Sequence, residues 1–202
     1  MIKAIIFDFD GVLADTWETG INICRDLKID FTLDDYRDHH NGNVFSQPKL
    51  KFSEKQANDF YSAYEEQASA DRLFPLTAEL KKLEKKYQLF VVSSGLEKAI
   101  NKYLALGKWD RFFKKILGVE TNKSKIKKIN MLFSDYDLRP EECIFVTDTL
   151  GDVIEAKSAG VKTLAVTWGY HGEMKLREGR PTKIIHEFGE LAQAVEVMAK
   201  IA

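Results

Sequence analysis

The distribution of hydrophobic residues along the chain predicts several short strands that are buried on both faces. Continuous apolar runs of this length, rich in branched and aromatic side chains, are typical of strands in a covered parallel sheet. The four clearest runs are residues 4–7, 89–92, 144–147 and 163–167. Two weaker runs, at residues 116–119 and 183–186, complete the expected set.

Between the expected strands, apolar residues recur at the spacing of amphipathic helices. Three such faces are formed by Leu80, Leu83 and Tyr87, by Ile129, Leu132, Phe133 and Tyr136, and by Ile154, Ala156 and Ala159. Strands that alternate with helices predict an α/β fold with a doubly wound parallel sheet. Ligands of such sheets bind beyond the carboxyl ends of the strands, so the polar residues found there are the candidates for chemistry.

The segment from Trp17 to about Arg72 departs from this alternation. It has helix-like stretches, many charges and several aromatic residues, but no convincing buried strand. Pro75 then marks the return to the alternating pattern. We therefore expect a Rossmann-like core formed by residues 1–16 and 73–202, and a small helical domain, residues 17–72, inserted after the first strand.

Charge and cysteine content narrow the classes of partner. With 30 basic and 31 acidic residues the net charge is −1, which provides no basic field for a nucleic acid or an anionic membrane. Cys24 and Cys143 lie in apolar stretches, so we expect buried free thiols rather than a disulfide or a zinc site. No secretory leader pattern opens the chain and no apolar run approaches ~20 residues, so we expect a cytoplasmic protein.

Two carboxylates and a glycine follow the first expected strand. Asp8 and Asp10 are two residues apart, and Gly11 allows the chain to bend sharply after them. One carboxylate of such a pair can act as a nucleophile while the other acts as an acid or base. Both can also bind a hard cation through oxygen.

Hydroxyl residues and lysines follow the next two expected strands. Ser93 and Ser94 precede a glycine, and a hydroxyl with backbone amides at the start of a helix can hold a phosphate. Lys123 and Lys125 lie at the start of the helix after the weaker strand, where an ammonium could neutralise the same phosphate. These residues therefore form a candidate anion-binding site.

A second pair of carboxylates, Asp148 and Asp152, follows the strand at residues 144–147. One can bind a cation directly, and the other can hold a metal-bound water or orient the lysine. Taken singly, each of these polar residues is equally well explained as a helix cap or a solvated side chain. Their joint order at successive strand ends favours a site for phosphoryl transfer.

In this order of motifs, the chain resembles the haloacid dehalogenase-like superfamily of phosphatases. The resemblance implies that Asp8 is the nucleophile, which forms an aspartyl-phosphate intermediate, and that Asp10 is the general acid and base. It also implies that Mg²⁺ is held by Asp8, by the backbone carbonyl of Asp10 and by Asp148. Asp148 and Asp152 match the acidic fourth motif of the family, and Asp152 would contact the residues that bind the metal rather than the metal itself.

The resemblance assigns the phosphate-binding residues as well. We expect Gly11, Ser93, Ser94 and a motif lysine to contact the phosphate. Of the two candidate lysines we choose Lys123. The segment Asn-Lys-Ser-Lys-Ile at residues 122–126 resembles the family's pattern of a lysine, a small residue and then the start of a helix. Lys125 also keeps a reasonable register with the apolar face of that helix.

By the same resemblance, the inserted segment is a cap that closes over the site and reads the leaving group. Residues 41–43, with His39 and His40 beside them, form a candidate substrate loop, although a histidine pair in a polar stretch is also typical of solvated surface. Residues 168–171 could form a rim of the site or the edge of the core. The pattern looks like the phosphoglycolate and phosphoserine phosphatase branches, but no cap residue identifies either substrate.

We therefore expect a magnesium-dependent hydrolase of a small-molecule phosphate monoester, acting as a monomer or dimer. Asp10 disfavours dehalogenation, because halide-displacing relatives lack an aspartate two residues after the nucleophile. The nearest alternative is a phosphomutase of the same superfamily. A receiver domain also forms phosphoaspartate, but it is far shorter and its aspartate does not lie in the first strand. A non-catalytic phosphate-binding protein on this fold would be expected to lose a motif carboxylate, and none is missing here.

Overall fold

A six-stranded parallel sheet forms the centre of the molecule, in a computed structural model that describes residues 1–46 and 48–200. The strand order is β3-β2-β1-β4-β5-β6, and every neighbouring pair is parallel. The strands are β1 (Ala4–Phe7), β2 (Gln88–Val92), β3 (Phe113–Leu117), β4 (Cys143–Thr147), β5 (Lys162–Val166) and β6 (Lys183–Ile185). This arrangement confirms the predicted doubly wound α/β fold.

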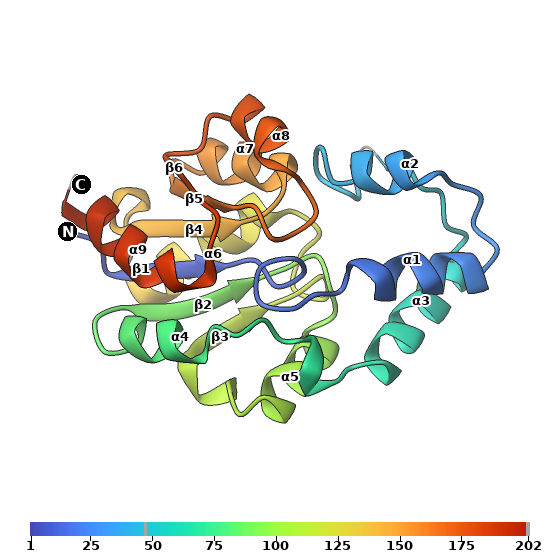
Figure 1. The fold of residues 1–202 in the computed structure, drawn as a ribbon, viewed down its shortest axis with the longest axis horizontal. Coiled ribbons are helices and arrows are strands. Elements are labelled where there is room, and N and C mark those ends of the chain that lie inside the picture. The colour runs from blue at the N-terminus through green and yellow to red at the C-terminus, as the bar shows by residue number, and fades with distance from the viewer. Residues whose placement is uncertain (47, 201–202) are drawn as a thin grey trace.

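Helices cover both faces of the sheet (Figure 1). The helices whose apolar residues join the cluster on one face are α4 (Thr77–Leu83), α5 (Glu97–Leu106) and α9 (Leu191–Lys200). The other face is covered by α6 (Lys125–Tyr136) and α7 (Leu150–Ser158), and α8 (Glu173–Glu178) packs against α7. Short 3₁₀ turns are η1 (Ala70–Arg72), η2 (Asp110–Phe112), η3 (Pro140–Glu142) and η4 (Phe188–Glu190).

Alternating side chains of the central strands enter two separate hydrophobic clusters. Ile5 and Phe7 of β1 pack on the α4, α5 and α9 side, whereas Ala4 and Ile6 pack on the α6 and α7 side. All four are fully buried. Because neither face meets water, every position of the strand has to be apolar, which explains the continuous runs in the sequence.

Two local expectations require correction. Ile154 is 47% exposed, and Val153 is buried on α7 in its place. Strand β3 covers residues 113–117, whereas the predicted run is 116–119, so the strand begins three residues earlier and ends two residues earlier than predicted. Its central lysines, Lys114 and Lys115, are exposed because β3 is at the edge of the sheet. An edge strand with charged side chains lacks the continuous apolar signal of a central one.

Three helices formed by residues 17–72 lie beyond the carboxyl ends of the strands (Figure 1). They are α1 (Trp17–Asp26), α2 (Leu33–Asp38) and α3 (Glu54–Glu66). Thr32 and Ser53 cap the last two through reciprocal bonds with residues three positions later, which explains where these helices begin. The segment has a hydrophobic cluster of its own, formed by Ile21, Cys24, Tyr36 and Leu50.

The two ends of this segment run side by side. The backbone N–H of Asp15 donates to the carbonyl of Arg72 (2.7 Å), and that of Phe74 donates to the carbonyl of Leu13 (3.0 Å). Entry and exit are therefore adjacent, as an insertion into a loop of the core requires. The division of the chain into core and cap at these residues stays a prediction.

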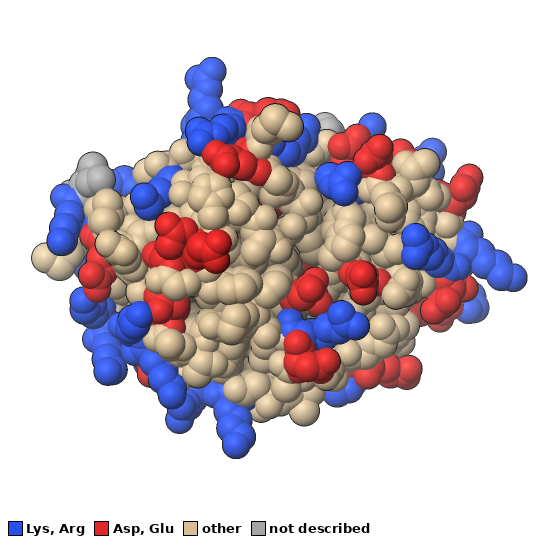
Figure 2. All heavy atoms as spheres, viewed as in Figure 1, with Lys and Arg blue, Asp and Glu red and all other residues tan. Residues whose placement is uncertain are grey.

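Both cysteines are buried and unpaired, as predicted. Within the described part of the chain, no helix combines the length and the apolar character needed to cross a bilayer. Figure 2 shows acidic and basic side chains interspersed around one face, whose middle is largely uncharged. Basic side chains are most frequent along the lower left edge of this face.

Candidate active site

The candidate site lies where the order of strands reverses. From β1 the chain builds β2 and β3 on one side, then crosses to β4 on the other side of β1. In open α/β sheets, this reversal opens a crevice at the carboxyl ends of the two adjacent strands. Asp8 directly follows β1 and Asp148 directly follows β4, so the topology places both carboxylates at the crevice.

Two glycines allow the backbone to approach the Asp148 carboxylate closely. Gly11 has φ of +73°, and a Cβ atom there, or at Gly169, would collide with Asp148 Oδ2. The same oxygen accepts a hydrogen bond from the N–H of Tyr170 (2.7 Å). Asp148 is fully buried, and within the part of the chain that the structure describes its other oxygen, Oδ1, has no hydrogen-bond partner. A buried carboxylate oxygen without a partner is costly, and a cation bound to this atom would remove that cost.

Lys125 lies between two carboxylates from different strand ends. Its Nζ is 2.8 Å from Asp8 Oδ2 and 2.5 Å from Asp152 Oδ2, and the lysine is only 3% exposed. Asp152 also accepts a bond from the hydroxyl of Thr147 (3.0 Å). Asp152 thus orients the lysine, which is one of the two roles that its position suggested.

The choice of Lys123 as the motif lysine needs correction on this geometry. Lys123 is exposed, and its Nζ lies 5.7 Å from the centroid of the Phe45 ring instead of beside Asp8. The reason is local. Ser124 is the N-cap of α6, so Lys125 is the first residue of the helix at the strand ends, whereas Lys123 precedes the cap. Both lysines line the same cavity, but only Lys125 reaches the carboxylates.

Burial controls the ionisation of these carboxylates. It raises the pKa of Asp8, against the opposing effect of Lys125, and it raises the pKa of Asp148 to about 7. Burial would also raise the pKa of Asp152, but Lys125 and the hydrogen bonds to that carboxylate lower it overall. One lysine therefore compensates Asp152 and only part of the charge on the other two.

The donors available fit a hard divalent cation such as Mg²⁺. Asp8 and Asp148 supply carboxylate oxygens, and no described residue pairs with Oδ1 of Asp148. The residues described here contain no group of three or more His, Cys, Asp or Glu side chains arranged as metal ligands. Mg²⁺ does not need one, because it keeps several waters and binds proteins through one or two carboxylates plus substrate phosphate.

Asp10 is held by hydroxyl groups from three separate parts of the chain. Its Oδ1 accepts bonds from Thr16 Oγ1 (2.8 Å) and from the hydroxyl of Tyr64 on α3, and its Oδ2 lies 3.4 Å from Ser93 Oγ. The carboxylate is thereby fixed at the mouth of the crevice. Thr16 and Tyr64 were not predicted, and in the sequence nothing about their spacing relates them to the strand ends.

The end of β2 carries the residues that we predict to bind phosphate. Ser93 is buried, its Oγ accepts from the N–H of Gly95 (2.9 Å), and Ser94 lines the cavity. Beneath it, the fully buried Lys128 donates to the carbonyls of Ser93 and Gly118 (3.2 Å for Gly118), joining the ends of β2 and β3. Burial lowers the pKa of Lys128 to about 8. Sequence reasoning missed this lysine, although its spacing of four residues from Leu132 places it on the buried face of α6.

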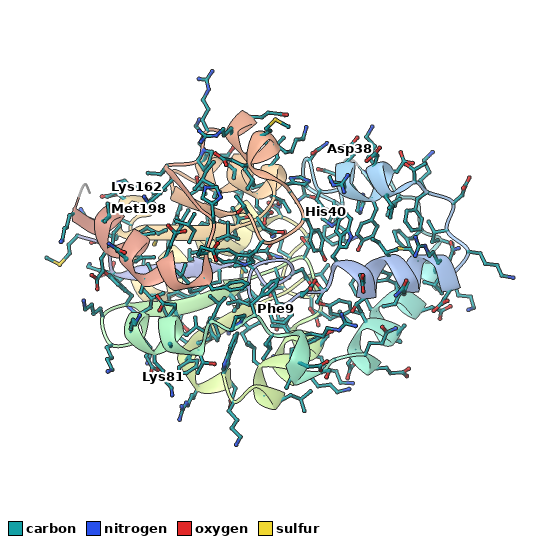
Figure 3. The ribbon with its side chains drawn as sticks, viewed as in Figure 1. Phe9, Asp38, His40, Lys81, Lys162 and Met198 are labelled. Atoms are coloured by element: carbon teal, nitrogen blue, oxygen red, sulfur yellow. The ribbon has the colours of Figure 1, made fainter. Side chains whose placement is uncertain are left out.

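A cavity of about 740 Å³ joins these residues to the inserted helices. The predicted substrate loop contributes His39, His40, Gly42 and Asn43 to its lining. The N–H of Gly151 donates to the carbonyl of His40 (3.1 Å), which holds the loop against the start of α7. Figure 3 labels His40 at this junction between α2 and the core. The loop is therefore part of the site wall rather than a solvated surface.

Further contacts tie the loop and the core together. Asn43 Nδ2 donates to Glu155 Oε1 (3.1 Å), and His171 Nε2 donates to the carbonyl of Arg37 (3.1 Å). In the segment considered as a rim, Tyr170 lines the cavity, while His171 is fully buried behind it. The site is thus enclosed by core and insertion together.

Family and sequence comparisons agree with this geometry. Residues 5–166 match the family model of haloacid dehalogenase-like hydrolases. The chain is 25% identical to a phosphoglycolate phosphatase of Haemophilus influenzae over 162 aligned residues, which cover 78% of this chain and 71% of that protein. It is 24% identical to pyrophosphatase PpaX of Bacillus cereus over 207 aligned positions, covering 94% of each chain.

Solved structures show the same fold. A haloacid dehalogenase-like family hydrolase from Streptococcus pneumoniae superposes with a TM-score of 0.76 at 23% identity, over 100% of this chain and 99% of that one. A predicted phosphoglycolate phosphatase from Haemophilus somnus superposes with a TM-score of 0.77 at 22% identity, over 96% and 98% of the two chains.

Proposed function

Because the chain belongs to the haloacid dehalogenase-like hydrolase family, we propose that it is a magnesium-dependent phosphatase that hydrolyses small-molecule phosphate monoesters through an aspartyl-phosphate on Asp8. One observation carries the proposal. Lys125 bridges Asp8 and Asp152, and an oxygen of the nearby Asp148 has no partner among the described residues. When ionised, the three carboxylates exceed the lysine by two negative charges, which a divalent cation would compensate so that a phosphate could approach. Similar proteins named as phosphatases support phosphate as the group attacked.

The first half-reaction transfers the phosphoryl group to the enzyme. Mg²⁺ held by Asp8, by the backbone carbonyl of Asp10 and by Asp148 would neutralise charge on the phosphate oxygens. Lys125 supplies a further positive charge, and Ser93 with the neighbouring amides binds another oxygen. The Asp8 carboxylate then attacks phosphorus, so that an Asp8 O–P bond forms while the bond from phosphorus to the leaving oxygen breaks. Asp10 donates a proton to that oxygen.

The second half-reaction uses the same groups in reverse order. Asp10, now ionised, takes a proton from water, and the water oxygen bonds to phosphorus as the Asp8 O–P bond breaks. Inorganic phosphate leaves and Asp8 is restored. The hydroxyls of Thr16 and Tyr64 support this role, because they hold the Asp10 carboxylate in a fixed position and Tyr64 comes from the insertion.

We further propose that residues 17–72 are a cap and that residues 1–16 and 73–202 are the catalytic core. The cap would bring Tyr64 to Asp10 only when it lies against the core. Its loop at His40 and Asn43 contacts the start of α7 and Glu155. Closure and complete placement of the acid–base group would therefore occur together.

Hydrolysis of p-nitrophenyl phosphate tests the proposal. Activity should require Mg²⁺, should disappear in excess chelator and should be absent in Asp8→Asn, because a neutral amide is a poor nucleophile. The matched control is Asp135→Asn, which removes an exposed carboxylate on α6 and should keep full activity. Full activity in chelator would refute the metal assignment, and full activity in Asp8→Asn would refute the nucleophile.

A further inference from the structure

The cavity is much larger than a phosphate group. It begins at Asp8 and Asp10, has a volume of about 740 Å³ and continues among the residues of the insertion. Sites for drug-sized ligands have volumes of roughly 300–1,000 Å³. A phosphate bound beside Asp8 would therefore occupy one end of the cavity, and the remaining space is available to the group that the phosphate esterifies.

One wall of this space is a row of aromatic rings that starts at Asp10. The Tyr64 hydroxyl donates to Asp10, and the Phe60 ring stacks on Tyr64 with centroids 6.3 Å apart and an interplanar angle of 16°. Phe52 follows at 5.7 Å from Phe60, and Tyr61 at 6.0 Å. All four aromatic residues line the cavity. Phe52 and Tyr61 lie edge-on to Phe60, at interplanar angles of 74° and 85°, so the group offers both ring faces and ring edges to an aromatic ligand.

Further uncharged aromatic residues line the same cavity, and Tyr36, Phe60 and Tyr170 pack in one hydrophobic cluster. Tyr170 bonds to Thr16 through its hydroxyl (3.0 Å), and its ring lies 6.4 Å from Tyr36 and 4.9 Å from His40. His40 Nδ1 donates to the carbonyl of Tyr36 (2.9 Å), so its Nε2 is a hydrogen-bond acceptor in the neutral ring. Burial lowers the pKa of His40 to about 3, which keeps that ring neutral.

The charges around the cavity disfavour a second anionic group on the substrate. Among the described lining residues there is no arginine, and the three lysines are Lys51, Lys123 and Lys125. Lys125 is already paired with Asp8, while Lys51 and Lys123 are exposed. Four acidic residues also line the cavity: Asp8, Asp10, Asp152 and Glu155. A second carboxylate or phosphate buried here would lose its hydration without gaining a buried cationic partner, because Lys51 and Lys123 are exposed.

From this cavity, and on the basis of the proposed function, we infer that the substrate is a phosphate monoester with a bulky, uncharged, aromatic leaving group. The leaving group would lie against the aromatic residues that line the cavity, among them Phe60 and Tyr170, with its ester oxygen at Asp10. Phosphoglycolate and pyrophosphate, on which the named relatives act, fit poorly here. Each places a second anionic group where the cavity offers apolar and acidic residues.

Paired esters test the inference by size and by charge separately. We would measure kcat/KM for 1-naphthyl phosphate and phenyl phosphate, whose leaving groups have similar acidity, and for 4-carboxyphenyl phosphate, phosphoglycolate and pyrophosphate. The kcat/KM for 1-naphthyl phosphate should be at least ten-fold higher than that for phenyl phosphate. The kcat/KM for 4-carboxyphenyl phosphate should be lower than that for phenyl phosphate. A higher kcat/KM for phosphoglycolate or pyrophosphate than for the naphthyl ester would overturn the inference, and so would equal values for the two neutral esters.

A variant that fills the cavity tests whether the aromatic group binds there. Ala57 is on α3 and lines the cavity, whereas Ser62 is on the same helix and exposed. Ala57→Trp should reduce the ratio of naphthyl to phenyl activity at least ten-fold, and Ser62→Trp should leave the ratio unchanged. Because both rates are measured on the same folded molecules, a partly unfolded preparation does not change the ratio. An unchanged ratio in Ala57→Trp would contradict the placement.

The two proposals fail in different ways. Hydrolysis that persists in chelator or in Asp8→Asn would overturn the proposed function, whatever the ranking of esters. Hydrolysis that depends on both the metal and Asp8, but is fastest with small anionic esters, would leave the proposed function intact and overturn the substrate class alone.

Discussion

Replacing Lys125 by methionine removes one charge from the centre of the site and keeps most of the side-chain volume. In the wild type, the ammonium is within 2.8 Å of Asp8 and 2.5 Å of Asp152, and all three residues are buried. In Lys125→Met, two buried carboxylates would face each other without a counter-ion. Lys123→Met is the matched control, because Lys123 is two residues away, exposed, and farther from these carboxylates.

The magnitude follows from the burial of the pair. Removing one partner of a buried ion pair costs about 3–5 kcal/mol, because the other charge is left without compensation. An exposed substitution changes stability by no more than about 0.5 kcal/mol. Protonation relieves the repulsion in Lys125→Met, and the folded state then binds more protons than the unfolded chain. Its stability should therefore fall as pH rises, relative to the wild type.

Urea unfolding in chelator measures this difference without interference from a bound cation. Lys125→Met should lose about 3–5 kcal/mol at pH 7 and less at pH 5, whereas Lys123→Met should match the wild type at both. Activity toward p-nitrophenyl phosphate should fall by about 10²–10³ in Lys125→Met alone, the range for a lost charge-stabilising donor. A greater effect from Lys123→Met on either quantity would refute the assignment of Lys125 and restore Lys123.

Three further predictions concern other parts of the molecule. Replacing residues 17–72 with a short linker should leave a folded core with a flattened ranking of esters in a kcat/KM panel; an unchanged ranking would show that this segment does not select the substrate. Burial lowers the pKa of Lys128 to about 8 from an ordinary 10.5, so the unfolded chain binds more protons than the folded one between these values. The free energy of unfolding measured in urea should therefore rise from pH 8 to pH 10, and Lys128→Met should lack that rise. Tyr64→Phe should retain the fold but lower kcat about ten-fold, because Asp10 loses a donor; an unchanged kcat would argue against this contact.

The buried strands and the carboxylates that follow them could be predicted because both are local in sequence. The runs around β1, β2, β4 and β5 are continuous and apolar, since helices cover both faces of the sheet. Parallel strands bring their carboxyl ends to one edge, so Asp8 and Asp148 could be placed together without knowing the strand order. The edge strand β3 was less accurately bounded because its lysines are exposed.

The remaining parts of the site depend on contacts between distant segments. Choosing between Lys123 and Lys125 requires the residue at which α6 begins, and a shift of two positions moves a side chain from solvent to the carboxylates. Tyr64 reaches Asp10 from 54 positions away in the sequence, through the packing of α3 on the core. Hydrophobic periodicity describes one element at a time and contains no information about such a contact.

The covalent intermediate offers the most direct measurement. Asp10→Asn removes proton transfer, an effect of typically about 10²–10⁴-fold, but leaves the Asp8 nucleophile in place. With p-nitrophenyl phosphate, whose leaving group hardly needs an acid, this variant should release a burst of nitrophenol and then turn over slowly. Intact-mass spectrometry after rapid acid quench should show one added phosphoryl group, located on Asp8 by peptide mapping. A burst from Asp8→Asn, or a phosphoryl group on any residue other than Asp8, would contradict the proposed mechanism.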